Sequence, residues 1–245
     1  MFHGTILCVQ RSEAIRRAAQ KLAEMGLHIT YTAAPDVTHM LLPIPSFPTG
    51  DEYLAHILVD LPDDVIVSGG NLNSPLLTAY HTIDFLQDPD YLAENAAITA
   101  KCAVRIVEEK LSDGLQDCSV LVLGWGRIGK CLCRLLQQAG ADVTCAARKG
   151  SDRAMLHALG CRGITIEEAR LEASRYRVIL NTIPAMVLPV LTTQPEAVIL
   201  ELASKPGMCG DHIVDARGLP GKMAPAESGE LIARTFLRLV LEKEA

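Results

Sequence analysis

Three glycines at a fixed spacing are the residues in this chain whose arrangement best fits a chemical task. They belong to a G-x-G-x-x-G motif, which consists of Gly124, Trp125, Gly126, Arg127, Ile128 and Gly129. The motif follows the apolar run 118–123 and begins an amphipathic run. In such a motif the first glycine permits a tight turn and the second lets the backbone approach a diphosphate. The third lets the helix pack closely on the strand. Free N–H groups at the helix start would bind the phosphates. The motif predicts dinucleotide binding, and the alternative is a purely structural glycine turn.

The residues about 20 positions after the motif indicate which dinucleotide is bound. A site selective for NAD usually carries Asp or Glu there to accept the ribose hydroxyls. This chain has Ala147, Arg148 and Lys149 instead. Two cations attract a 2′-phosphate, and Arg148 could hold it through two hydrogen bonds. The sequence therefore favours NADP over NAD, and the alternative is a solvated cationic turn.

Two further segments follow apolar runs directly and are expected at the same edge of a sheet. The run 176–180 is followed by Asn181, Thr182, Ile183 and Pro184, and the run 197–202 is followed by Ser204 and Lys205. Ligands of doubly wound sheets lie off the carboxyl ends of the strands. We therefore assign residues 181–184 and Ser204 to the coenzyme site. An ordinary Asn-Thr-x-Pro turn is the alternative.

Other kinds of catalytic site have no signature in this sequence. We find no Ser/His/Asp set, no H-E-x-x-H motif and no lysine-bearing phosphate loop. The eight cysteines are scattered and lie mostly in apolar runs, which is typical of buried, reduced thiols and predicts no metal site. His81 and His212 lie near predicted turns, where a histidine is more often a surface residue than an acid or base. The catalytic residue stays unassigned.

Composition excludes several function classes. The chain has 245 residues, 23 Lys and Arg against 29 Asp and Glu, and a net charge of −6. An acidic total without a basic stripe argues against nucleic-acid or membrane-surface binding. No window reaches the roughly 18 apolar residues of a membrane span, so we expect a cytoplasmic protein.

Apolar runs alternate with helical patterns along the whole chain, which predicts an α/β fold with parallel sheets. The first half shows strand-like runs at 4–9, 28–32, 39–44 and 65–67, an irregular proline-rich loop at 43–50, and a long helix at 89–111 that Asp88 could cap. The second half shows strand-like runs at 118–123, 142–146, 176–180, 197–202 and 211–214. We divide the chain into an N-terminal domain (1–112), a Rossmann domain (113–224) and a C-terminal helix (225–245).

Several longer strings resemble one family. NTIPAMVL (181–188), LELASKPG (200–207) and ARGLPGKMAPAESGELIA (216–233) look like the A subunit of dipicolinate synthase. The GWGRIGK turn resembles that family's Gly-x-Gly-Arg-x-Gly, and NAAIT (95–99) resembles its Asn-x-x-x-Thr segment. The resemblance is dense from about residue 88 onward and faint before it.

The resemblance implies a flavodoxin-like N-terminal domain, a Rossmann domain and a terminal helix that returns to the first domain. It also implies oxidation of a dihydrodipicolinate-type cyclic dicarboxylate to dipicolinic acid with NADP⁺, in the mother cell of a spore former. The partner would be the flavoprotein-like B subunit, and we expect a homo-oligomer. Ser46, Asn95, Thr99 and Lys205 are the candidate contacts for the substrate carboxylates.

The chain departs from the family pattern at several positions. Lys101 and Cys102 stand where relatives tend to have Glu-Gly, Lys205 replaces an Arg, and Met208 replaces a Gly. Two other hypotheses therefore stay open. One is an NADP-linked oxidoreductase of another hydroxy or imino acid, and the other is a non-catalytic dinucleotide-binding subunit.

Overall fold

The computed structural model describes residues 4–47, 50–191 and 193–244, so Pro48 and Thr49 of the proline-rich loop lie outside it. The chain forms two compact units. The first comprises Met1–Asn95 and Pro220–Ala245, and the second comprises Ala96–Leu219. The boundary between the two units falls inside α3 (Pro89–Lys110), whereas the sequence analysis places the domain boundary after residue 112. A continuous helix has no turn residues by which a sequence pattern could mark such a boundary.

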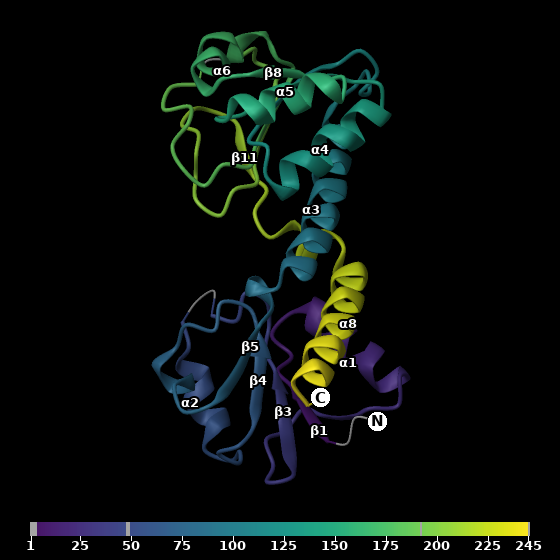
Figure 1. Cartoon of the computed structure of the whole chain (residues 1–245), viewed down its shortest axis with the longest axis vertical. Helices are drawn as coiled ribbons and strands as arrows, with labels where there is room; N and C mark the ends of the chain where they lie inside the picture. The colour runs from purple at the N-terminus through teal and green to yellow at the C-terminus, as the bar shows by residue number, and fades with distance from the viewer. Residues whose placement is uncertain (1–3, 48–49, 192, 245) are drawn as a thin grey trace. The chain divides into compact units, whose positions relative to one another are not determined.

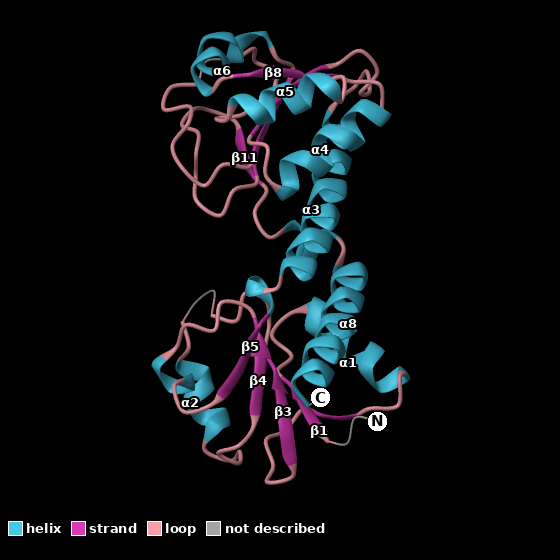
Figure 2. Ribbon diagram, viewed as in Figure 1, coloured by secondary structure: helices cyan, strands magenta, loops and turns pink. Residues whose placement is uncertain are grey.

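The first unit contains a five-stranded parallel sheet (Figure 2). Its spatial order is β2-β1-β3-β4-β5, the flavodoxin-like order 2-1-3-4-5. The strands are β1 (Thr5–Cys8), β2 (His28–Thr30), β3 (Val37–Leu41), β4 (Ile66–Gly69) and β5 (His81–Asp84). The sequence does not predict β5, because only Ile83 of its four residues is buried and no apolar alternation marks it.

Helices cover the first sheet, and the longest of them comes from the end of the chain. They are α1 (Glu13–Glu24), α2 (Glu52–Leu58) and α8 (Pro225–Glu244), with short 3-10 turns η1 (Pro75–Leu77) and η2 (Phe85–Gln87). α8 packs along α1 (Figure 1). A Cβ atom on Gly229 would lie 2.8 Å from the carbonyl oxygen of Ala14, so glycine permits this close approach.

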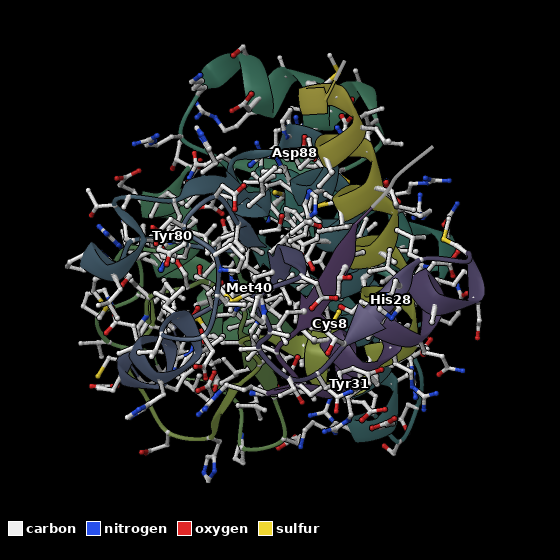
Figure 3. All side chains as sticks on the ribbon, turned by 90° about the horizontal axis from the view of Figure 1, so that it is seen from below. Cys8, His28, Tyr31, Met40, Tyr80 and Asp88 are labelled. Carbon is white, nitrogen blue, oxygen red and sulfur yellow. The ribbon has the colours of Figure 1, made fainter. Side chains whose placement is uncertain are left out.

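Side chains of the first unit sort by burial as an α/β core requires. Met40 of β3 and Cys8 of β1 are buried, whereas Tyr31 is largely exposed (Figure 3). Burial raises the pKa of the Cys8 thiol to about 12, so this thiol stays protonated. Asp88, also labelled in Figure 3, caps α3 through the N–H of Tyr91 at 2.7 Å, as the sequence predicts.

The second unit contains a six-stranded parallel sheet in the order β11-β10-β9-β6-β7-β8. Counted within the unit this is 6-5-4-1-2-3, the Rossmann order read from the opposite edge, so the predicted fold class is confirmed. The strands are β6 (Ser119–Leu123), β7 (Asp142–Ala146), β8 (Arg162–Ile164), β9 (Val178–Asn181), β10 (Val198–Glu201) and β11 (Ile213–Asp215). The residues of β9 and β10 are all buried, as expected when helices cover both faces of a sheet.

The remaining helical elements are α4 (Arg127–Gln138), α5 (Gly150–Ala158), α6 (Ile166–Glu172), the 3-10 turn η3 (Ala173–Arg175) and the short α7 (Leu219–Met223). The sequence predicts α4 but misses α5, β8 and α6. These elements are short, and Leu156 is the only buried residue of α5. No helix among the described residues is both long and apolar enough to cross a membrane.

Candidate dinucleotide-binding site

The three glycines of the motif have different structural roles. Gly124 has φ 103°, and a Cβ there would lie 2.6 Å from Oγ1 of Thr182. A Cβ on Gly129 would overlap the carbonyl oxygen of Gly124. A Cβ on Gly126 would meet no atom within 4 Å. Gly124 and Gly129 are therefore needed for packing, whereas the space beside Gly126 is open to a ligand.

Gly126 is also the N-cap of α4 and offers no side chain to the helix start. The first turn of α4 contains no acidic residue. The first N–H groups of a helix lack partners within the helix, and the helix dipole adds positive potential there. The start of α4 is therefore suited to a diphosphate.

A cavity of about 710 Å³ lies at this point in the second unit. Such a volume is within the range of ligand sites in proteins. It brings together three segments that the sequence assigns to the coenzyme: the glycine loop, the end of β7 and the loop after β9. Its lining residues are Gly124, Trp125, Gly126, Ala146, Ala147, Arg148, Lys149, Asp152, Ile166, Glu167, Thr182, Ile183, Pro184, Ala185 and Val187.

The end of β7 carries the two cations expected to select the coenzyme. Ala147 is buried, whereas Arg148 and Lys149 are exposed at the cavity. Arg153 supports this turn, because its Nη1 donates hydrogen bonds of 2.9 Å to the carbonyl oxygens of Ala147 and Arg148. The backbone that presents Arg148 is therefore held in place from α5.

Two carboxylates that the sequence does not assign also line the cavity. Asp152 lies in the first turn of α5, and Glu167 lies in α6, next to Ile166. Because α5 and α6 are not predicted from the sequence, these residues could not be placed beside Arg148. Asp152 sits only three positions beyond Lys149, which is the one sequence signal that could have found it.

The loop after β9 forms another wall of the cavity. Oγ1 of Thr182 donates to the carbonyl oxygen of Leu123 at 2.8 Å, which ties this wall to the glycine loop. Asn181 lies behind the wall and is fully buried. Its Nδ2 donates to Ile183 and Glu201, and its Oδ1 accepts from the N–H of Ile183. Its amide is thus engaged within the protein, and it does not line the cavity.

Other predicted coenzyme residues lie outside the lining of the cavity. Arg127, Ile128 and Gly129 belong to the first turn of α4, with Gly129 buried against the glycine loop. Ser204 is exposed in the loop after β10. A direct contact of Ser204 with the coenzyme stays a prediction.

The four candidate substrate residues have different environments. The hydroxyl of Ser46 is buried, donates to the carbonyl oxygen of Pro43 at 2.8 Å and accepts from the N–H of Gly70 at 3.0 Å. It therefore joins the loops after β3 and β4. Thr99 of α3 is buried, Asn95 of α3 is half-buried and Lys205 is exposed. Their contacts with a substrate stay predictions.

The departures from the family pattern also differ in environment. Lys101 is exposed on α3, whereas Cys102 is buried. Met208 is 5% exposed and packs into the apolar core of the second unit. Met208 is therefore a packing residue. His81 begins β5, and His212 lies in the turn before β11.

Of the seven cysteines in the second unit, three interact with one another, and one of these contacts the glycine loop. The thiol of Cys145 donates to the carbonyl oxygen of Gly124 at 3.7 Å. A hydrogen bond with Cys145 raises the pKa of Cys133, and one with Cys133 raises the pKa of Cys161. Cys133 and Cys161 therefore stay protonated and are poor nucleophiles. Within the described residues no group of three or more His, Cys, Asp or Glu side chains is placed to hold a metal.

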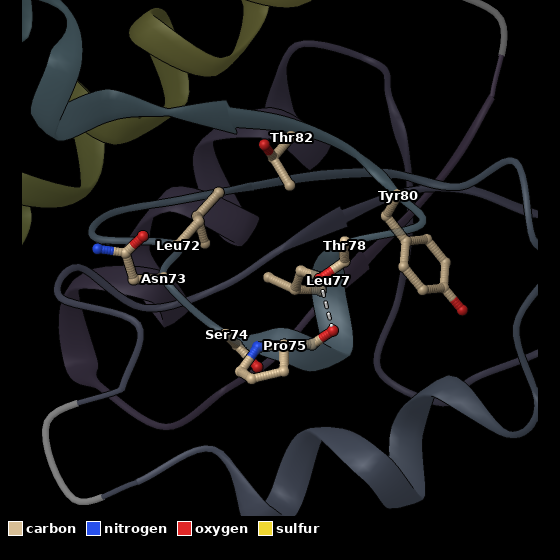
Figure 4. Close-up of a pocket in the computed structure, with 8 residues that line it drawn as sticks. All are labelled: Leu72, Asn73, Ser74, Pro75, Leu77, Thr78, Tyr80 and Thr82. Carbon is tan, nitrogen blue, oxygen red and sulfur yellow. Dashed lines mark hydrogen bonds between the residues drawn. The ribbon is translucent and has the colours of Figure 1, made fainter.

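A second cavity, of about 510 Å³, lies in the first unit (Figure 4). Its lining consists of apolar, hydroxyl and amide side chains, namely Leu72, Asn73, Ser74, Pro75, Leu77, Thr78, Tyr80 and Thr82. The hydroxyl of Thr78 donates to the carbonyl oxygen of Pro75 at 2.8 Å, and that of Ser74 donates to Asp51. Because the described residues lining it carry no charge, this cavity is poorly suited to an anionic ligand.

The two sheets and the cavity at the glycine loop define an α/β protein with one Rossmann unit and one flavodoxin-like unit. No protein-family model matches the chain. The chain is 28% identical over 174 residues to the A subunit of dipicolinate synthase from Bacillus subtilis (strain 168). This match covers 66% of the chain and 59% of that relative, which is less than two thirds of its length.

Solved structures share the fold over nearly the whole chain. The A subunit of dipicolinate synthase from Bacillus halodurans has a TM-score of 0.82 at 22% identity, covering 96% of this chain and 97% of that one. A transhydrogenase from Sinorhizobium meliloti has a TM-score of 0.73 at 13% identity, covering 98% and 95%. The resemblance to the dipicolinate synthase A subunit indicated by the sequence motifs is thus confirmed.

Proposed function

We propose that this protein is a nicotinamide-dependent oxidoreductase similar to the A subunit of dipicolinate synthase, with NADP as its coenzyme. The main supporting observation is the cavity where an open glycine, an uncapped helix start and two cations meet. The free N–H groups of α4 would bind the diphosphate, and Arg148 with Lys149 would bind the 2′-phosphate.

The proposed reaction oxidises a dihydrodipicolinate-type cyclic dicarboxylate to dipicolinic acid. The ring loses a hydride and a proton and becomes aromatic, and the coenzyme, when bound, supplies the hydride acceptor. The contribution of this chain is to orient the coenzyme and exclude water from one of its faces. Thr182, Ile183 and Pro184 would provide that face, and Ser46, Asn95, Thr99 and Lys205 remain the proposed carboxylate contacts.

We extend the proposal to the setting of the protein. The flavoprotein-like B subunit would be its partner, the chain would form a homo-oligomer, and it would act in the cytoplasm of a spore former's mother cell. The resemblance to the dipicolinate synthase A subunit supports this setting. The alternatives are oxidation of another hydroxy or imino acid, and binding of the dinucleotide without catalysis.

Coenzyme titration tests the proposal directly. Trp125 is the one tryptophan of the chain and lines the cavity, so its fluorescence should report binding. We expect NADP⁺ to bind more tightly than NAD⁺, and reduced coenzyme to accumulate when the cyclic precursor is added. Binding without turnover, even with the B subunit present, would favour the non-catalytic alternative. An absence of binding by both dinucleotides would contradict the proposal altogether.

Replacing Arg148, one of the two exposed cations at the cavity, tests the preference for NADP⁺ over NAD⁺. Arg148→Ala should lower affinity for NADP⁺ about tenfold and change affinity for NAD⁺ less than about twofold, because only NADP⁺ carries the 2′-phosphate. Arg105→Ala, which removes an exposed arginine of α3, is the matched control. Calorimetric titration measures both affinities. Equal losses for the two dinucleotides would show that Arg148 has another role.

A further inference from the structure

Glu201 is a buried acidic residue at the carboxyl end of β10, with 5% of its surface exposed. Its Oε1 accepts from Nδ2 of Asn181 at 2.8 Å and from the N–H of Ala203 at 3.1 Å. Its Oε2 accepts from the N–H of Gly207 at 2.8 Å. All three partners are donors, which suits an ionised carboxylate, because a carboxylate only accepts hydrogen bonds.

These bonds connect two loops that are distant in sequence. Asn181 holds Ile183 through its amide, so Glu201 acts on the wall formed by residues 182–185. Gly207 holds the next part of the wall, because its carbonyl oxygen accepts from the N–H groups of Val187 and Leu188 at 2.7 and 3.0 Å. A Cβ on Gly207 would lie 2.8 Å from the carbonyl oxygen of Ile183, so the two loops are in close contact.

The part of the cavity that Glu201 supports lies away from the cations. Arg148 and Lys149 follow β7. The wall formed by residues 182–185 follows β9, and Glu201 supports it from the end of β10. The glycine loop follows β6, which lies between β7 and β9 in the sheet. If the 2′-phosphate binds after β7 and the diphosphate at the glycine loop, the nicotinamide half extends toward β9.

We propose that Glu201 is a positioning residue for the nicotinamide half of the coenzyme. This inference rests on the proposed function. The buried carboxylate holds residues 182–185 and 187 in the form against which the nicotinamide and its ribose bind. Replacing it with an amide leaves a donor facing donors, and an unsatisfied buried polar group is costly in a low-dielectric interior.

The test compares a whole coenzyme with one half of it. Wild type, Glu201→Gln and the control Glu196→Gln are titrated with NADP⁺ and with adenosine 2′,5′-bisphosphate, which lacks the nicotinamide half. Glu196 is an exposed glutamate of the same unit. Thermal unfolding of each variant is recorded alongside.

We expect Glu201→Gln to bind NADP⁺ about tenfold more weakly, a loss of about 1.4 kcal/mol, and to bind the bisphosphate within about twofold of wild type. The control should bind both ligands as wild type does. An equal loss for both ligands, or no loss for NADP⁺, would overturn the inference. If Glu201→Gln does not fold, Glu201→Asp replaces it. Its carboxylate brings no donor among donors but is one methylene shorter and does not reach all three partners, so the same difference between the ligands is expected.

The inference and the proposed function can fail separately. Wild-type protein that binds neither NADP⁺ nor NAD⁺ contradicts the proposed function. Wild-type protein that binds NADP⁺, together with a Glu201→Gln variant that binds it equally well, contradicts only the role of Glu201.

Discussion

At the residue scale, identical residue types in one motif have separate tasks that spacing alone does not distinguish. Gly129 is confined by the carbonyl oxygen of Gly124, whereas Gly126 faces open space. Asn181 and Thr182 are neighbours in sequence, yet only Thr182 lines the cavity. The sequence identifies the motif, but the role of each member depends on the atoms that surround it.

Alanine substitutions should separate these roles. Gly129→Ala should lower the free energy of unfolding by about 2–4 kcal/mol, because its methyl group overlaps backbone. Gly126→Ala should change the free energy of unfolding by less than about 1 kcal/mol, because the φ of −84° at this position suits alanine. The same variant should bind NADP⁺ at least about tenfold more weakly, because its methyl group occupies the space proposed for the diphosphate. Urea unfolding and calorimetric titration measure the two effects, and Gly221→Ala, also without neighbours within 4 Å, is the control. A stable Gly129→Ala variant would contradict this assignment.

Asp152 provides a second test at this scale. It lines the cavity in which Arg148 would hold a 2′-phosphate, and a carboxylate repels that group. Asp152→Asn should therefore tighten NADP⁺ binding about two- to fivefold while leaving NAD⁺ binding nearly unchanged. A large loss of NAD⁺ affinity would instead show that Asp152 binds the ribose hydroxyls and that NAD is the natural coenzyme. Fluorescence titration of Trp125 measures both affinities.

At the element scale, long and strongly patterned elements follow from the sequence and short ones do not. The apolar strands β6, β9 and β10 and the amphipathic α4 lie where the sequence predicts them. β5, β8, α5 and α6 are missed because their burial comes from neighbouring elements rather than from a local pattern. β8 has three residues, of which Ile164 alone is buried. Because Ile166 and Glu167 follow β8, missing that strand also conceals part of the cavity.

The ion pair between Asp88, which caps α3, and Arg238 of α8 should make the stability of the protein depend on pH. Oδ2 of Asp88 accepts from the N–H of Tyr91 and, at 2.6 Å, from Nη2 of Arg238. Burial raises the pKa of Asp88, but these two hydrogen bonds outweigh it, and the pKa lies below its ordinary value of 3.8. A depressed pKa stabilises the fold above the unfolded value, and this stabilisation disappears as the pH falls through the folded value.

Asp88→Asn should retain the helix cap and lose the ion pair, whereas Asp88→Ala should lose both. We expect losses of about 1 kcal/mol for the first variant and about 2 kcal/mol for the second at pH near 6. Both losses should shrink at a pH near 3, because this lies below the ordinary pKa of 3.8 at which the carboxyl protonates in the unfolded chain. Urea unfolding at the two pH values measures them. A loss for Asp88→Asn that grows on acidification would contradict the expected sign of the pH dependence.

At the scale of the whole molecule, the reactivity of the cysteine thiols tests whether both units are folded as described, because the thiols differ in burial. Of the eight cysteines, Cys209 is exposed, Cys118 and Cys131 are half-buried, and the others are buried. At pH 8 a thiol reagent should react rapidly with Cys209, more slowly with the half-buried pair, and with all eight only after denaturation. Cys209→Ser should remove the rapid phase, as followed by the absorbance of the released reagent. Rapid reaction of a buried thiol would show that one unit opens readily.

The sequence by itself determines that the chain is an α/β protein with a glycine motif between strand and helix, because these patterns are local and strong. It also carries the resemblance to the dipicolinate synthase A subunit, which lies in contiguous strings. Only the tertiary structure decides that Asn181 is buried, that Asp152 and Val187 line the cavity, and that Glu201 joins two loops. The physical reason is that a side chain's partners and exposure depend on backbone brought from distant parts of the chain, which no local pattern contains.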